Sequence, residues 1–145
     1  MTRPTLSSSF ILLLCLLLAG CSLFTSLTEP EKNRRSFDLI TDDFTQRLRW
    51  QDYGAAAGHL AEPLRKEFLD RFRRDIDLKI TDVRQENLIF NEEKTRAEGD
   101  LVIEYYRLPS PAVKTARLPL TWSFFGPKDP TPVGWKITHL QPDLP

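Results

Sequence analysis

The residue types best suited to proton transfer in this chain are its two histidines, His59 and His139. A histidine changes its charge near neutral pH and can act as a general base. These two lie far apart on different expected elements, and a lone histidine near a core face is more often a hydrogen-bonded structural residue. Asp52 and Asp100 offer carboxylates, but no carboxylate of the chain lies inside an apolar strand face, where desolvation would raise a pKa. We therefore expect no catalytic residue among them.

The motifs of common catalytic and cofactor sites are missing from the sequence. It has no pair of Cys or His at metal-ligand spacing, no glycine-rich phosphate loop and no Gly-x-Ser-x-Gly turn. The 20 Lys and Arg residues balance the 20 Asp and Glu residues, so no bulk field attracts nucleic acid. We expect a protein that is not an enzyme, with no cofactor, no metal and no nucleic-acid partner.

The remaining reactive group is the thiol of Cys21. A polar start with Arg3, an apolar run from Phe10 to Ala19 and the small residue Gly20 precede it. This layout is typical of a secretory signal. The alternative, a membrane-spanning anchor, needs ~20 consecutive apolar residues, and this run reaches about half that length before Gly20.

The four residues Leu18, Ala19, Gly20 and Cys21 resemble the lipobox of bacterial lipoproteins. The resemblance implies that signal peptidase II removes residues 1–20 and that the sulfur of Cys21 carries a diacylglyceryl group. With Cys15 discarded and Cys21 lipidated, the mature domain would have no disulfide. One acyl chain binds a membrane only marginally, whereas two or three anchor it stably.

The resemblance also implies a location in the bacterial cell envelope. Ser22 follows the cysteine, and in enteric-type bacteria an Asp at that position retains a lipoprotein at the inner membrane. By this analogy Ser22 favours the outer membrane, with the domain facing the periplasm. A Gram-positive source would instead place the domain on the outer face of its single membrane. Residues 21–35 have no sustained period and are expected to form a lipidated tether.

Helical periodicity begins after this tether. Phe37, Ile40, Phe44 and Leu48 recur at helical spacing, with Ser36 as the expected N-cap. A second, short helix is expected over residues 53–60, capped by Asp52, and a third from residue 62 to residue 74, with proline in its first turn.

Strand periodicity follows over residues 76–90, with a bulge expected near Thr81 and Asp82. A polar turn at residues 91–94 joins this strand to a second one that runs to residue 106, and residues 108–111 interrupt the ladder with two prolines. Further strands are expected up to residue 124 and over residues 134–139. Pro119 suggests an edge or a bulge.

Helices followed by about four antiparallel strands make an α+β order, with N-terminal helices packed on a curved sheet. This order resembles the NTF2-like, or cystatin-like, fold. Residues 49–57 (RWQDYGAAA) look like its helix-break-helix segment, and residues 134–137 (GWKI) look like its final strand. The resemblance covers residues 36–140, so residues 36–145 are expected to form one NTF2-like domain, similar to those of small envelope lipoproteins.

NTF2-like domains often enclose a conical cavity between helices and sheet, and in ketosteroid isomerase and the polyketide cyclases a buried Asp or His acts there with a Tyr. By this resemblance, the candidate lining residues are Tyr53, Tyr105, Trp122, Trp135 and His139. The competing interpretation is that aromatic residues at alternating spacing form a core.

The leading hypothesis is a non-enzymatic binding or accessory module, anchored to the membrane by its N-terminal lipid, for another envelope component, most simply a protein. The turn at residues 108–111 is one candidate surface. The alternative is a small apolar-ligand pocket or an isomerase- or cyclase-like enzyme, and a domain that only braces the envelope is a third reading. Homodimers are common among NTF2-like domains and stay an open alternative.

One charged segment offers a further surface. Arg71, Arg73 and Arg74 flank Phe72 and could face lipid head groups or an acidic partner. Three neighbouring aspartates (Asp70, Asp75 and Asp77) neutralise this run, so the sequence favours a solvated helix face with Phe72 buried.

Overall fold

The computed structural model describes residues 29–141 of the chain. The expected signal peptide, the lipobox with Cys21 and residues 22–28 of the tether lie outside the described residues. The elements within them are α2 (Glu29–Arg49), α3 (Tyr53–Ala57), α4 (Glu62–Arg74), β1 (Leu78–Phe90), β2 (Arg96–Arg107), β3 (Ser110–Phe125) and β4 (Gly134–Leu140). No helix of this described part is long and apolar enough to cross a membrane.

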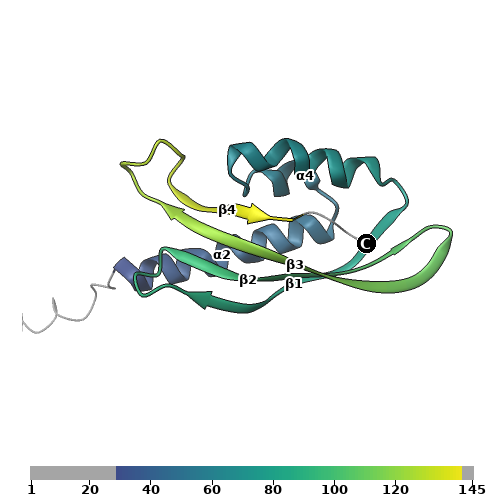
Figure 1. Cartoon of the computed structure of the whole chain (residues 1–145), viewed down its shortest axis with the longest axis horizontal. Coiled ribbons are helices and arrows are strands. Elements are labelled where there is room, and N and C mark those ends of the chain that lie inside the picture. The colour runs from purple at the N-terminus through teal and green to yellow at the C-terminus, as the bar shows by residue number, and fades with distance from the viewer. Residues whose placement is uncertain (1–28, 142–145) are drawn as a thin grey trace, which may run out of the picture.

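The four strands form one antiparallel sheet in the order β1-β2-β3-β4. Figure 1 shows α2 running along one face of the curved sheet, with α4 packed beyond β4. The expected α+β class and four-stranded antiparallel sheet are therefore confirmed. Each connection between strands is short, so each strand lies antiparallel beside the strand before it.

The first helix begins earlier than its apolar periodicity predicts. It starts at Glu29, so the expected start at Ser36 is wrong and the expected tether overlaps the helix. Ser36 is no N-cap: its hydroxyl donates to the Asn33 carbonyl, a bond typical of a helix interior. The Trp135 indole N–H also donates to the Asn33 carbonyl at 3.0 Å, which holds this early turn against the sheet.

The other two helices lie close to their expected positions. The Asp52 carboxylate accepts a hydrogen bond from the Ala55 N–H at 3.1 Å, which confirms its role as the cap of α3. That helix ends at Ala57 rather than at residue 60, because Leu60 instead pairs with Ile137 beside β4. Pro63 lies in the first turn of α4, as expected, and Phe72 is buried.

Aromatic side chains from both layers form the core between the helices and the sheet. Phe37 of α2 packs edge-on against Phe90, Trp122 and Trp135, with ring centroids 4.9 to 5.7 Å apart. Burying a large apolar side chain stabilises a fold by ~1.5 to 3 kcal/mol. These contacts therefore hold α2 against the inner face of the sheet.

Strand β1 has irregular pairing at two places. The ladder with β2 shifts between Ile80 and Asp82, which confirms the expected bulge, and again between Glu86 and Ile89. At the second place, a Cβ on Gly99 would lie 2.8 Å from the Glu86 carbonyl oxygen, so this position requires glycine. The strand begins at Leu78, and Ile76, expected within it, lies outside and is 82% exposed.

The two prolines of residues 108–111 lie where β2 turns into β3. Arg107 pairs with Ser110 across this turn, so the segment closes a hairpin. Pro119 pairs with Asp100 of β2, just before the ladder with β4 starts at Leu120. Strand β3 is an edge at that point, which is one of the two settings expected for this proline.

Candidate functional site

The two edges of the sheet differ in how they are covered. On β4, Ile137 exchanges backbone hydrogen bonds with His59 and Ala61 at 2.8 and 2.9 Å, so the segment after α3 covers that edge. Strand β1 pairs only with β2 within the described residues. Its other side faces α2, and unpaired backbone groups of an edge strand are a template for another chain.

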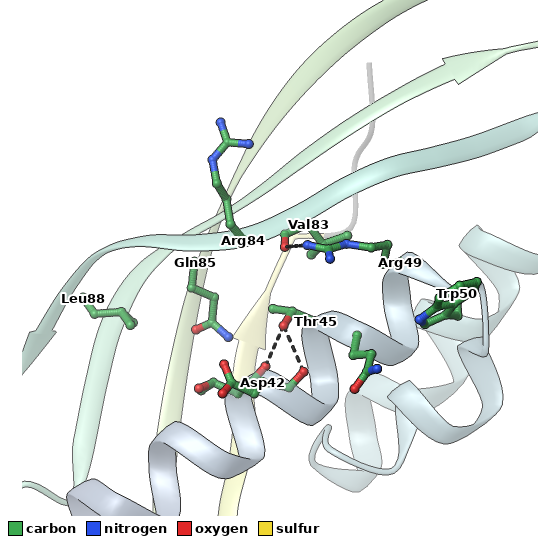
Figure 2. A pocket seen from close by; sticks show the side chains of 10 residues that line it. Asp42, Thr45, Arg49, Trp50, Val83, Arg84, Gln85 and Leu88 are labelled. Carbon is green, nitrogen blue, oxygen red and sulfur yellow. Dashed lines mark hydrogen bonds between the residues drawn. The ribbon is translucent and has the colours of Figure 1, made fainter.

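A cleft of about 620 Å³ lies between α2 and this open edge, and we call it the α2–β1 cleft. Figure 2 shows that its walls come from the second half of α2 and the middle of β1. The residues that line it are Thr41, Asp42, Thr45, Gln46, Arg49, Trp50, Val83, Arg84, Gln85 and Leu88. Most of these side chains are polar, so the cleft suits an occupant with hydrogen-bonding groups.

Trp50 is the large apolar side chain of this cleft. It follows the last residue of α2 and is 75% exposed. A tryptophan at such exposure leaves a large apolar area in water, and tryptophan is among the residues that contribute most binding energy at interfaces. The indole is therefore available as an anchor for a partner.

Arg49 connects the end of α2 to the edge of β1. Its Nη2 donates to the Asp82 carboxylate at 2.6 Å. The same nitrogen donates to the Val83 carbonyl at 3.1 Å (Figure 2). The Val83 carbonyl therefore points away from β2 and into the cleft. Because backbone groups alternate along an antiparallel strand, those of Gln85 face the same side.

Gln85 extends from β1 toward α2, opposite to Arg84 (Figure 2). Its Oε1 accepts a hydrogen bond from the buried Trp122 indole at 3.0 Å, which fixes the orientation of the amide. The Nε2 of Gln85 is buried and has no acceptor among the described residues. An unpaired buried donor costs free energy. The hydrogen bond to Trp122 therefore matters for the wall of the cleft, because it holds the Gln85 amide in this position.

The α2 wall is already partly satisfied. The Thr45 hydroxyl donates to the backbone carbonyls of Thr41 and Asp42, both at 3.0 Å, so it turns toward its own helix (Figure 2). Asp42 is exposed. The groups that remain for a partner are thus the Asp42 carboxylate, the Gln46 amide and the Trp50 ring.

A second, smaller cleft of about 250 Å³ adjoins the first and shares Gln46 and Trp50 with it. Here Asp43 Oδ2 lies 2.8 Å from Nε2 of His59 and 2.7 Å from Nε of Arg47. The hydrogen bond from Arg47 lowers the pKa of Asp43, and burial lowers the pKa of His59 against the opposing effect of Asp43. An ionised carboxylate can only accept, so Nε2 of His59 donates this hydrogen bond, as expected for a structural histidine.

The expected pocket residues are distributed over separate parts of the structure. Trp122, Trp135 and Tyr105 are fully buried in the core, and the two tryptophans meet around Phe37. Tyr53 packs on Phe72 of α4, and burial raises its pKa to about 12. None of these residues lines the α2–β1 cleft.

His139, the fifth residue of that set, is exposed and lines a cleft of about 360 Å³ together with Asp100. Asp100 accepts a hydrogen bond from the Asn87 amide at 2.8 Å. His139 and Asp100 are residue types that can transfer protons, and they lie far apart in the sequence. The structure places both at the same cleft. Within residues 29–141, no cluster of three His, Cys, Asp or Glu side chains is arranged to hold a metal ion.

Sequence reasoning missed the α2–β1 cleft. From sequence, Trp50 belongs only to the expected helix-break-helix segment at residues 49–57, and Gln85 belongs only to the strand expected over residues 76–90. A tryptophan outside the apolar stripe of its helix was the available signal, because such a residue must be exposed or covered by another element.

The chain was compared with protein-family models, with curated proteins and with solved structures, and none of the three comparisons gives a match.

Proposed function

We propose that this protein is a lipid-anchored protein of the bacterial cell envelope whose domain binds another envelope protein without catalysing a reaction. The lipobox-like residues 18–21 support the anchor. The observation that carries the binding function is the exposed Trp50 at the α2–β1 cleft, next to the open edge of β1. The NTF2-like ancestry of the domain is part of this proposal.

The partner that fits this cleft is an extended polypeptide segment. A strand laid along β1 would hydrogen-bond the outward backbone groups of Val83 and Gln85, which is the mode of recognition called β-augmentation. Trp50 would take an apolar side chain of that segment. Asp42 and Gln46 on the opposite wall would fix its register through polar contacts.

The pairing would be short. Register shifts on either side limit the uninterrupted pairing around Val83 and Gln85 to residues 82–86 of β1, and bulges of this kind protect an edge from indefinite strand addition. Arg49 already caps the Val83 carbonyl and must move to admit a partner strand. These two features favour the binding of one specific partner segment over aggregation of this chain through its open edge.

The test is crosslinking of the full chain in intact host cells, comparing Trp50→Ala with Leu39→Ala. Leu39 is 70% exposed on α2, the helix that Trp50 follows, and does not line the cleft, so it is a matched control. We expect Trp50→Ala to abolish crosslinks to one specific envelope protein and Leu39→Ala to retain them. Equal partner recovery from both variants would refute the cleft as the binding site. A crosslink to a second copy of this chain would instead indicate a homodimer.

The anchor is tested separately by the mass of the protein from the membrane fraction. A chain that starts at Cys21 and carries acyl groups is expected, and a chain retaining residues 1–20 would contradict it. The ligand-pocket or isomerase function stays the alternative prediction. The burial of Trp122 and Trp135 against Phe37 gives it less support than the cleft gives the binding function.

A further inference from the structure

The end of the molecule opposite to the start of α2 has an unusual surface. The last turn of α4, the segment that leads into β1 and the β2–β3 hairpin meet there, and the hairpin projects beyond the rest (Figure 1). We call this surface the basic tip. It consists of residues 70–79 and 107–114.

The basic tip holds an excess of positive charge. Its cations are Arg71, Arg73, Arg74, Lys79, Arg107 and Lys114, and its carboxylates are Asp70, Asp75 and Asp77. Six against three leaves a net charge of +3 at the tip in a chain that is neutral as a whole. The three aspartates neutralise the arginines of α4, as the sequence indicates. The excess of positive charge comes from the cations that the strands add, which are Lys79, Arg107 and Lys114.

Two of the aspartates are held by cations. Asp75 Oδ2 accepts from Nε of Arg107 at 2.7 Å, and Asp70 Oδ2 lies 2.7 Å from Nζ of Lys66 and 3.3 Å from Nη2 of Arg74. The guanidinium of Arg107 also lies over the Tyr105 ring, at 5.2 Å. Arg107 is thus fixed in position at the tip.

These arginines converge on a cleft of about 300 Å³, lined by Arg71, Arg74, Asp75 and Arg107. Three guanidinium groups face two carboxylates here, Asp75 in the cleft and Asp70 beside it on Arg74, and this excess of positive charge favours a further anion. The C-terminal dipole of α4 accounts for basic residues in the last turn of that helix, but Arg107 comes from β2. Guanidinium groups match the geometry of phosphate oxygens.

Exposed aliphatic side chains surround this cationic surface. Ile76 is 82% exposed, Val113 58% and Leu108 48%. Ile76 lies in the segment between α4 and β1, and Leu108 lies in the β2–β3 turn, where the Leu108 N–H donates to the Asp77 carbonyl and joins the two segments. Aliphatic tips beside basic residues are typical of surfaces that dip into a bilayer interface.

We propose that the basic tip docks on an anionic phospholipid bilayer, with the arginines on lipid phosphates and the three aliphatic side chains in the interface. A projecting tip fits a flat, deformable surface, whereas a protein partner would need a matching concave site. This goes beyond the proposed function, because it requires neither the lipid at Cys21 nor the α2–β1 cleft.

The test measures amide hydrogen exchange of the full chain on vesicles. Phosphatidylcholine vesicles with and without phosphatidylglycerol are compared, so any binding through the N-terminal segment is present in both. We expect slower exchange at residues 107–114 only with phosphatidylglycerol, and reversal of the effect by high salt. Each basic residue near an anionic surface strengthens binding about fivefold. The variant Arg74→Gln/Lys114→Gln is therefore expected to bind about 25-fold more weakly at the tip.

Arg96→Gln/Lys128→Gln is the matched control, because it removes two exposed cations outside the tip. Leu108→Ser should also weaken the protection, without changing any charge. Equal exchange on both vesicle types, or equal losses in the tip variant and the control, would overturn the proposal. Protection by soluble polyglutamate but not by vesicles would assign the tip to an acidic protein instead, and would also overturn it.

Discussion

Gly99→Ala tests whether the second irregularity of β1 is a built feature of the fold. The added Cβ would lie 2.8 Å from the Glu86 carbonyl oxygen and 3.0 Å from Cδ2 of Leu88. The Leu88 side chain can rotate, but the Glu86 carbonyl is backbone and can yield only if β1 shifts. Overpacking of this kind typically costs ~1 to 3 kcal/mol.

The assay is the free energy of unfolding from denaturant titration of the full chain, with Gly126→Ala as the matched control. At Gly126 a Cβ would meet its nearest neighbour, an oxygen of Asp129, at 3.7 Å, which is an ordinary contact. Removing that glycine should be neutral or stabilise by up to about 1 kcal/mol, because alanine restricts the unfolded chain.

The comparison of the two variants decides the matter. A loss of stability in Gly99→Ala that Gly126→Ala does not show would confirm the close approach of β1 and β2. If both variants unfold at the same denaturant concentration, the contact between Gly99 and Glu86 does not constrain the strand. The limit that we place on the length of a partner segment at β1 would then lose its basis.

Two further predictions concern buried or partly buried polar groups. In a double-mutant cycle of Gln85→Leu and Trp122→Phe, each single change leaves a buried hydrogen-bonding group of the other residue unpaired. The two changes together should therefore cost ~1 to 3 kcal/mol less than the sum of the single changes, whereas strict additivity in denaturant titration would contradict the pairing. For His59, burial lowers the folded-state pKa below the unfolded value of about 6.5, so the unfolded chain binds more protons and stability should decline as the pH falls below about 6.5. His59→Gln should flatten this dependence between about pH 7 and pH 5, and an unchanged slope would show that another group causes it.

Local patterns in the sequence predicted most of the elements but not all of their limits. Helical and strand periods located three helices and four strands, and the break at Thr81 and Asp82 indicated the first bulge. The start of α2 could not be found in this way. The turns before Ser36 have no apolar stripe, and the Asn33 carbonyl that anchors them bonds to Trp135, which is 102 residues away in the chain.

The candidate site was harder to predict because its parts are distant in sequence. The cleft joins Arg49 at the end of α2, and Trp50 directly after it, to Val83 and Gln85 on β1. Only the packing of the helix on the sheet brings them together. The hydrogen bond between Asp43 and His59 is likewise invisible to a search for spaced motifs. By contrast, Asp52 could be assigned from sequence, because a cap acts within its own turn.

The position of the proposed anchor limits how the basic tip can meet a membrane. Residues 22–28 separate Cys21 from α2, and seven extended residues span at most about 25 Å. Helix α2 adds about 31 Å over its 21 residues, and Figure 1 shows the tip at the opposite end of the long axis. A lipid-anchored chain that stands upright therefore holds the tip away from its own bilayer.

Two arrangements follow from this geometry. If the domain lies flat, the tip reaches the anchoring bilayer, and exchange at residues 107–114 slows on a single vesicle that contains phosphatidylglycerol. If it stands upright, the tip reaches a second surface, and chains anchored in phosphatidylcholine vesicles should gather vesicles of phosphatidylglycerol around them. Because residues 83–88 of β1, which line the α2–β1 cleft, lie outside the tip, the cleft can hold a protein segment in the upright arrangement while the tip is engaged. Vesicle clustering by wild-type protein, but not by Arg74→Gln/Lys114→Gln, would therefore select the upright arrangement.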